Sequence, residues 1–170
     1  MACLKFMQNV WQRTLSKGGH DANVLSSLRL LEARPGYIRG AFKIDAKHLN
    51  NHNTIHGGAI LTLTDTITSL SLSTHGLLAP TGVSVDISTS FVRPGGTTGS
   101  DLICIGTVEQ LGRTLAYTKC EFYTPPGGER GNKLVAYGAQ TKFMGGAKPV
   151  VRFSADGETE LPLENTEAKL

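Results

Sequence analysis

Charged residues are scarce in this 170-residue chain, at 18% of the total, and the basic ones never form a run. The formal net charge is only +3. Proteins that bind nucleic acid usually concentrate Lys and Arg on one face or in one stretch, so this composition argues against a nucleic-acid partner. A small anionic ligand stays compatible with it. Because 39% of the residues are hydrophobic, the composition also argues against a disordered chain.

Cysteine and long apolar runs are scarce as well. The three cysteines, Cys3, Cys104 and Cys120, are widely spaced and odd in number, which is a poor disulfide framework and is typical of a reducing compartment. Residues 66–85 contain no Asp, Glu, Lys or Arg, but only eight of these 20 residues are apolar. A membrane-spanning helix needs about 20 predominantly apolar residues, so the sequence predicts no membrane span.

Glycine, in contrast, is abundant, with 20 residues in the chain, which exceeds the usual share of about 7%. The glycines follow no fixed period, and this excludes a collagen-like chain. They indicate many turns, or a backbone that must approach another group closely.

The length fits one domain of ordinary size, and the residue pattern divides the chain into three parts. Residues 1–20 hold apolar residues at helical spacing and no acid, which predicts an N-terminal helix or extension. A basic start is also compatible with a mitochondrial transit peptide, so we expect a cytoplasmic or mitochondrial protein. Residues 21–146 form the predicted domain, and the chain up to residue 146, the N-terminal part included, carries a net charge of +5. Residues 147–170 are acidic, and we expect a mostly mobile tail in which 150–153 can pack.

Alternating polar and apolar residues predict six strands, at 26–33, 37–45, 82–93, 100–111, 113–124 and 133–143. Short turn sequences separate the last four, including the glycine cluster at 95–99, which we interpret as a hairpin turn. The four strands are therefore predicted to form an antiparallel meander.

The segment 57–74 has two interpretations. Its alternation of Thr with apolar residues favours a strand. A stripe formed by Ile60, Leu63, Ile67 and Leu70 favours a helix, with Gly76 as its C-terminal stop. Propensity alone slightly favours the strand.

A motif in and around this segment decides the matter. Asn50 is followed by His56-Gly57-Gly58 and then by Asp65, two helical turns later. This arrangement resembles the His-Gly-Gly signature of hotdog-fold acyl-CoA thioesterases, in the branch of PaaI and acyl-CoA thioesterase 13. The resemblance continues at 82–86, 94, 112–116 and 141–142 and spans residues 20–146. It implies an α+β hotdog fold, in which a curled antiparallel sheet of five to six strands wraps a long central helix. It therefore favours the helix for 57–74.

Physical chemistry supports a thioester site at Gly57. The first amides of a helix that begins there have no intrahelical acceptor, and the helix dipole adds partial positive charge. An amide directed at a thioester carbonyl stabilises the developing oxyanion, and glycine lets that carbonyl approach closely. Asp65 lies about 12 Å further along the helix, too far for a substrate at its own Gly57. The resemblance implies the answer: in a homodimer, Asp65 of one subunit faces Gly57 of the other.

The resemblance also implies roles for the remaining residues. Asp65 is the expected general base or nucleophile, Asn50 and His56 orient the water or the carbonyl, and Ser84 holds the attacking water. Base-activated water and a mixed anhydride on Asp65 both stay open. The assembly is expected to be a dimer of dimers, without metal or redox cofactor, and coenzyme A enters as part of the substrate. The candidate CoA-binding residues are Gly58, Val85, Asp86, Phe91, Arg93, Leu111, Gly112, Arg113 and Thr114.

Some features stay open or point elsewhere. We expect the substrate to be a medium- or long-chain fatty acyl-CoA. Phe91 stands where relatives often have Tyr, and Phe143 stands where some have His, so the chain-length preference and the CoA contacts are not decided by the sequence. His48, His52 and His56 are spaced like metal ligands on a helix, but the Asn-rich sequence between them is a poor helix former. Two rival functions are a non-catalytic acyl-CoA-binding module and a hotdog hydratase or dehydratase.

Overall fold

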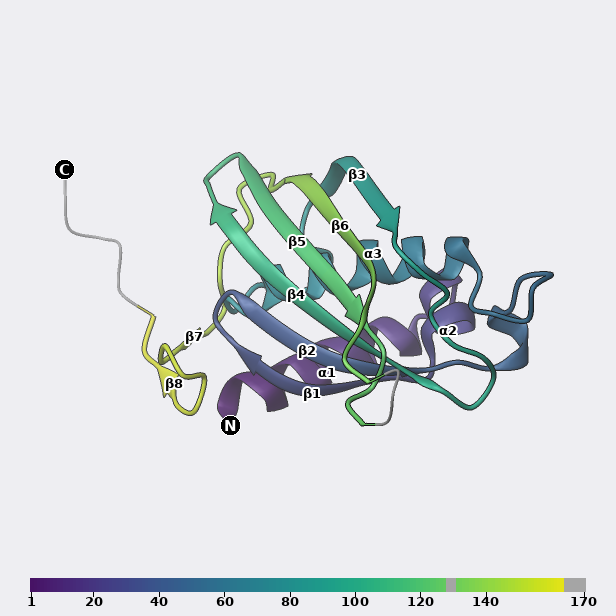
Figure 1. Ribbon diagram of the computed structural model, residues 1–170. Helices are drawn as coiled ribbons and strands as arrows, with labels where there is room; N and C mark the ends of the chain where they lie inside the picture. The colour runs from purple at the N-terminus through teal and green to yellow at the C-terminus, as the bar shows by residue number, and fades with distance from the viewer. Residues whose placement is uncertain (128–130, 164–170) are drawn as a thin grey trace.

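The computed structural model describes residues 1–127 and 131–163. A six-stranded antiparallel sheet has the order β1-β2-β4-β5-β6-β3, and the long helix α3 runs across one of its faces (Figure 1). The helices are α1 (Ala2–Ser16), α2 (His20–Leu25), the 3-10 turn η1 (Ala46–His48) and α3 (Gly57–Ser73). The strands are β1 (Leu28–Arg34), β2 (Tyr37–Lys43), β3 (Val83–Phe91), β4 (Asp101–Leu111), β5 (Leu115–Tyr123), β6 (Leu134–Phe143), β7 (Arg152–Phe153) and β8 (Glu160–Leu161).

The contested segment is a helix, as the resemblance implied. Leu63 and Ile67 are fully buried against the sheet, whereas Leu61 is 41% exposed, which is the pattern of a helix and not of a strand. Threonines in α3 donate their hydroxyl groups to carbonyls four residues earlier, at 3.0 Å for Thr62 and 3.1 Å for Thr64. Such bonds keep threonine hydroxyls satisfied inside a helix, so the Thr-rich sequence does not prevent it.

Two glycines let α3 lie close to the sheet. A Cβ atom on Gly106 of β4 would lie 2.8 Å from Cγ2 of Ile67, and one on Gly138 of β6 would lie 2.8 Å from Cγ2 of Thr64. Both distances are shorter than real side chains tolerate, so a larger residue at either place would push the helix outward.

The predicted meander is wrong for β3. Strands β4, β5 and β6 are consecutive neighbours, but β3 pairs with β6 at the sheet edge, and β4 pairs with β2. The glycine-rich connection after β3 is therefore not a hairpin. It packs inward: Gly95 is buried, a Cβ on it would lie 2.7 Å from Ile55, and the amide of Ile55 donates to the carbonyl of Gly96 at 3.0 Å.

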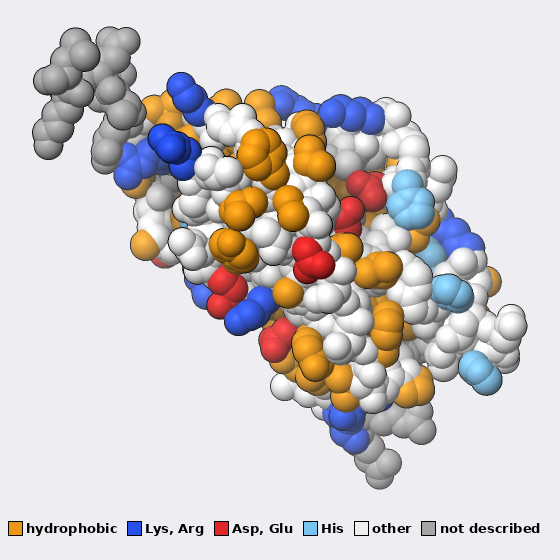
Figure 2. Space-filling model, turned by 90° about the horizontal axis from the view of Figure 1, so that it is seen from above, with side chains coloured by type: hydrophobic (Ala, Val, Ile, Leu, Met, Phe, Trp, Pro, Cys, Tyr) orange, Lys and Arg blue, Asp and Glu red, His pale blue; other side chains and the backbone are white. Residues whose placement is uncertain are grey.

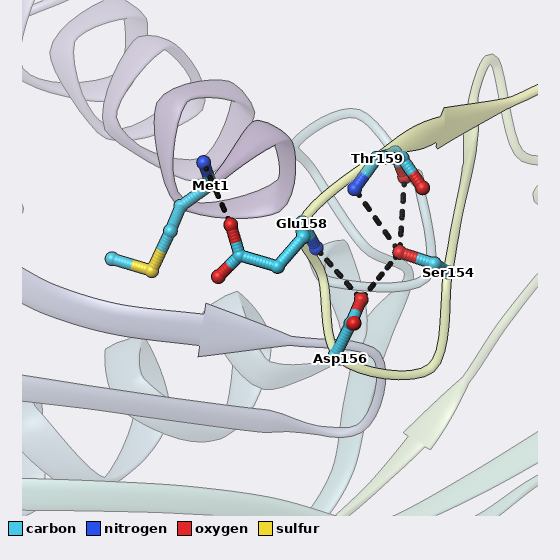
Figure 3. Close-up of polar contacts among 5 residues, drawn as sticks. All are labelled: Met1, Ser154, Asp156, Glu158 and Thr159. Carbon is cyan, nitrogen blue, oxygen red and sulfur yellow. Dashed lines mark hydrogen bonds and ion pairs between the residues drawn. The ribbon is translucent and has the colours of Figure 1, made fainter.

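The two ends of the described chain contact each other. The Met1 amine forms an ion pair with Glu158 at 3.2 Å (Figure 3). The amide of Cys3 donates to the carbonyl of Gly157 at 3.0 Å. Asp156 orders the turn between β7 and β8 by accepting from the hydroxyl of Ser154 at 2.6 Å and the amide of Glu158 at 3.0 Å. These contacts attach the segment after β6 to the start of α1.

The same segment contributes to the core. Val151 and Phe153 are buried, and the Phe153 ring lies 5.5 Å from that of Phe6 in α1. The mobility expected for the tail therefore does not describe residues 150–153, which the sequence allowed to pack. Residues 164–170 of the predicted tail lie outside the described residues.

The amphipathic N-terminal helix packs on the sheet. Met7 and Trp11 of α1 are buried, and the Trp11 indole donates to the carbonyl of Leu28 at 3.1 Å. Across the described residues, no helix combines the length and the apolar character that crossing a bilayer requires.

Candidate active site

The N-terminal end of α3 is formed by His56 and Gly57. The His56 backbone is extended, and its ring Nδ1 accepts a hydrogen bond from the amide of Gly58 at 2.8 Å, which makes His56 the N-cap. Because Nδ1 accepts, the proton of the neutral ring lies on Nε2. Among the described residues, the amide of Gly57 has no hydrogen-bond acceptor. Its nearest side chain is Phe91, whose ring would lie 3.3 Å from a Cβ at Gly57.

Asn50 organises the turn before this helix. Its Oδ1 accepts from the amides of His52 at 2.8 Å and Thr54 at 3.3 Å, and its Nδ2 donates to the Thr54 hydroxyl at 3.1 Å. The turn delivers the chain to His56, whose amide donates to the carbonyl of His48 at 2.7 Å. Within one chain, the Asn50 amide group is thus engaged locally.

Asp65 lies in the middle of α3 and is held from the sheet. Its Oδ1 accepts from the Gln140 side-chain amide at 2.6 Å, and the same Gln140 nitrogen donates to the Ser84 hydroxyl at 2.8 Å. Gln140 on β6 therefore links the carboxylate of α3 to the hydroxyl of β3. The Asp65 side chain is exposed, so a single chain does not enclose it.

A cavity of about 490 Å³ opens beside this carboxylate. Its walls come from α1, α3, the loop before β3 and the end of β6, and they include Trp11, Leu70 and Ser84. The amine of Lys142 also lines it, only 5% exposed, and donates to the Ser69 hydroxyl at 2.7 Å. Burial lowers the pKa of Lys142 below its ordinary value, and the carboxylates of Asp65 and Asp21 partly oppose this. The cavity thus holds a cation and a carboxylate.

The open amide and the carboxylate occupy separate parts of the chain. They are eight residues apart on one helix, which corresponds to about 12 Å along its axis. Gly57 faces Phe91 at the end of β3, whereas Asp65 meets Ser84 at the start of the same strand. A carbonyl bound at Gly57 is therefore out of reach of Asp65 in the same chain.

Comparison with known proteins identifies the family. The family model described as the thioesterase superfamily matches residues 52–130. Human acyl-coenzyme A thioesterase 13 is 32% identical over 133 residues, which cover 78% of this chain and 91% of that protein. The chain belongs to the thioesterase superfamily. This membership confirms the predicted enzyme class, a thioester hydrolase, and the predicted family.

Two further similarities extend along most of this thioesterase. A Schizosaccharomyces pombe protein that is named as a proposed esterase is 36% identical over 141 residues, covering 83% of this chain and 84% of that protein. The crystal structure of zebrafish thioesterase superfamily member 2 has a TM-score of 0.67 and 29% identity, covering 78% of this chain and 91% of the other. With α3 lying across the antiparallel sheet, the hotdog fold is confirmed.

The structure brings some predicted site residues of the thioesterase together and separates others. Asp65 and Ser84 meet through Gln140, and His56, Gly57 and Gly58 meet at the helix start. His48 is buried at 3% exposure and uses both ring nitrogens, with the amide of Asp45 at 2.9 Å and the carbonyl of Val24 at 2.7 Å. In the described part of the chain, no group of three or more His, Cys, Asp or Glu is arranged to hold a metal ion.

The residues predicted to bind CoA are spread over the molecule. Leu111, Gly112 and Arg113 form the β4–β5 turn and line a second cavity of about 600 Å³, together with Lys148 and Arg152. The carbonyl of Thr114 accepts from the amide of Met144 at 2.8 Å. The other candidates on or after β3 are exposed, namely Val85, Asp86, Phe91 and Arg93.

Sequence reasoning missed two residues of the Asp65 cluster as members of the site. Gln140 and Lys142 both lie on β6, 75 and 77 residues after Asp65 in the chain. Lys142 belonged to the family resemblance but received no role, and Gln140 was not singled out. The available signal was a polar residue that shares the inward face of a strand with small residues. Such a pattern predicts a buried polar group that needs hydrogen-bond partners.

Proposed function

We propose that this thioesterase hydrolyses an acyl-CoA to the free acid and CoA at a site shared by two subunits. Asp65 of one subunit acts on a thioester whose carbonyl oxygen binds the Gly57 amide of the other. One observation supports this proposal above all. In a single chain, the Gly57 amide has no acceptor among the described residues, and the Asp65 carboxylate, held by Gln140, cannot reach a carbonyl bound at that amide. Residues 21–146 are the proposed catalytic domain, with 1–20 and 147–163 packed around it.

In the proposed reaction, Asp65 removes a proton from water while the water oxygen attacks the thioester carbon. The Gly57 amide stabilises the oxyanion, and the C–S bond then breaks to release the CoA thiolate, which takes up a proton. Ser84 is placed to hold the water, and Asn50 and His56 to orient the carbonyl side. Direct attack by Asp65, forming a mixed anhydride that water then hydrolyses, is the second route.

The edge of the sheet supports the dimer. In the described structure, β3 pairs on one side only, with β6, and it presents large exposed side chains: Val83 at 69%, Val85 at 62% and Phe91 at 57% exposure. An edge strand with unpaired backbone groups is a template for pairing with a second copy, and such pairing is isologous in a two-fold dimer. Hydrophobic side chains also gather in patches on the face shown in Figure 2. These patches fit a dimer of dimers.

The nature of the substrate rests on relatives and charge. The human relative is named for acyl-coenzyme A, and CoA is anionic. The β4–β5 turn places Arg113 on the second cavity, which Lys148 and Arg152 also line. These cations suit phosphate groups. We assign the CoA end of the substrate to this basic side of the molecule and leave the acyl chain length open.

A thiol-release assay over a panel of short, long and aromatic acyl-CoA substrates tests the proposal. Wild type should release CoA, and Asp65→Asn should lose at least about 100-fold in kcat, the lower range for a general base. The variant should keep its melting temperature, since the amide retains size and shape. Equal CoA release by both proteins would overturn the role of Asp65.

The same assay separates the rival functions. A non-catalytic acyl-CoA-binding module would bind the panel without releasing thiol. A hydratase or dehydratase would alter the absorbance of an enoyl-CoA without releasing thiol. Thiol release that depends on Asp65 excludes both.

A further inference from the structure

Gln140 occupies a central place in the Asp65 cluster. It is 1% exposed, on β6 between β5 and β3. Its amide nitrogen carries two protons, and both are used: one bond goes to Asp65 Oδ1 at 2.6 Å and the other to Ser84 Oγ at 2.8 Å. One side chain from the sheet therefore sets the spacing between the carboxylate on α3 and the hydroxyl on β3.

The groups at the two ends of this amide decide its orientation. Gln140 Oε1 accepts from the Thr68 hydroxyl at 2.6 Å, one turn of α3 after Asp65. If the amide were reversed, its oxygen would face the Asp65 carboxylate at the 2.6 Å that now separates donor from acceptor, and two acceptors would repel each other. The Asp65 carboxylate therefore selects the orientation in which the Gln140 nitrogen donates, and this orientation uses both protons of that nitrogen. The single proton of the Thr68 hydroxyl, which also has the Thr64 carbonyl at 2.7 Å, is compatible with it.

This arrangement also directs the Ser84 proton. Because Ser84 Oγ accepts from Gln140, its own hydroxyl proton is not needed for that bond and can be donated to another acceptor. Ser84 is exposed and lines the 490 Å³ cavity together with Asp65. Its proton is therefore available to the attacking water or to substrate oxygen on the cavity side.

We propose that Gln140 is a positioning residue for the hydrolysis: it holds Asp65 and Ser84 at a fixed separation and keeps the Ser84 hydroxyl as a donor toward the cavity. This inference rests on the proposed thioesterase role of Asp65. Gln140 does not titrate, so it takes no part in proton transfer. It acts only through the two groups that it holds.

Two substitutions test this role by removing or inverting the donor. Gln140→Met keeps the length but cannot donate, and we expect kcat to fall about 10- to 100-fold, as for other supporting hydrogen bonds around a reactive group. KM should change less than twofold, because the buried side chain does not reach the solvent-facing part of the substrate. Gln140→Glu keeps the shape, and its carboxyl donates only when protonated. Its activity relative to wild type should therefore rise as the pH falls.

The matched control is Thr118→Val. The Thr118 hydroxyl donates to the Gln140 backbone carbonyl at 2.9 Å and is 2% exposed. This variant loses a buried hydrogen bond between β5 and β6, and it leaves the side-chain contacts of Gln140 with Asp65 and Ser84 in place. It should lower the melting temperature while kcat stays within twofold of wild type. Circular dichroism at each pH confirms that kcat refers to folded protein.

The outcomes separate this inference from the proposed function. If Asp65→Asn is inactive and Gln140→Met retains wild-type kcat, the positioning role is wrong and the base assignment stands. A loss of kcat in Thr118→Val equal to that in Gln140→Met would also overturn it, since strand packing would then explain both. In the double variant Asp65→Asn/Gln140→Met, we expect no loss beyond that of Asp65→Asn, because groups that act as one unit are not additive.

Discussion

The start and the middle of helix α3 are built in opposite ways. At the start, the Gly57 amide has no acceptor among the described residues, and the exposed Phe91 ring is the side chain nearest to a Cβ placed at Gly57. In the middle, Asp65 is held through Gln140 by groups from β3 and from its own helix. The contrast teaches that a single chain positions its carboxylate but offers no acceptor for the amide at the start of the helix. In the proposed dimer, a second copy of the chain would bring the two groups together.

Among the substitutions that test this comparison, removal of the Gly57 amide proton should have the largest effect on activity. Gly57 is the first residue of α3 after an extended His56 (φ −68°, ψ 138°), a place where proline is well tolerated. Gly57→Pro should therefore fold but lose the oxyanion donor, and kcat should fall about 100- to 1,000-fold. The measurement is steady-state thiol release.

Gly57→Ala is the matched control, because it adds a Cβ against the far end of the Phe91 ring but keeps the amide proton. It should lose far less activity than the proline variant. Equal losses in both variants would show that steric contact with Phe91, and not the amide, limits the rate.

Mixing two inactive variants tests whether each site is shared. A dimer of one Asp65→Asn chain and one Gly57→Pro chain contains one site with both wild-type groups. Random reassembly should therefore restore about a quarter of wild-type activity for a two-fold dimer. Thiol release after co-refolding, compared with each variant refolded alone, is the measurement. No recovery would place both groups in the same chain's site.

Charging the open edge of the sheet should sharpen the comparison further. Ser88 lies in the middle of β3 with an exposed side chain, and lysine on an edge strand opposes strand pairing. Ser88→Lys should shift the protein toward monomer in light scattering and lower activity about tenfold at dilute enzyme. Activity should recover as protein concentration rises. A fully active monomer would contradict the shared site.

The smallest effect concerns the far end of α3. His75 follows the helix and lines the second cavity, and burial lowers the pKa of His75 below its ordinary 6.5. The unfolded chain therefore binds the proton at a higher pH than the folded chain, so stability present above pH 6.5 is lost as the pH falls toward the folded pKa. His75→Leu should reduce this loss. Urea unfolding at pH 7.5 and pH 5 measures it, and identical pH dependence in both proteins would contradict it.

The sequence predicted local structure better than long-range pairing. All six strands occur where alternation indicated them, because the period of two is a local signal. The pairing of β3 with β6 was missed, because the sequence around Gly95 does not distinguish a glycine packed inward from a glycine in a hairpin turn. Propensity favoured a strand for 57–74, and only the His-Gly-Gly resemblance corrected it.

The candidate site shows the same division. Gly57, Asp65 and Ser84 were named because the spacing of a family motif can be recognised in a single sequence. Gln140 was not, because its place on the strand indicates only a buried polar group, and sheet topology alone brings β6 beside Asp65. The structure supplied its role through two distances, 2.6 Å to Asp65 and 2.8 Å to Ser84.

The close approach at Gly106 and Gly138 has a mechanical consequence. Each glycine has only a hydrogen atom where another residue has a Cβ. The distance between α3 and the sheet is therefore set by the contacts of Ile67 with Gly106 and of Thr64 with Gly138. Thr64 is the residue directly before Asp65, so the close contact between Thr64 and Gly138 of β6 also fixes the distance of the Asp65 carboxylate from the sheet. A single methyl group there would lift the helix, and a misplacement of about 1 Å can cost 100-fold in rate. In the proposed mechanism, part of the catalytic accuracy of this thioesterase would therefore depend on two residues that have no side chain.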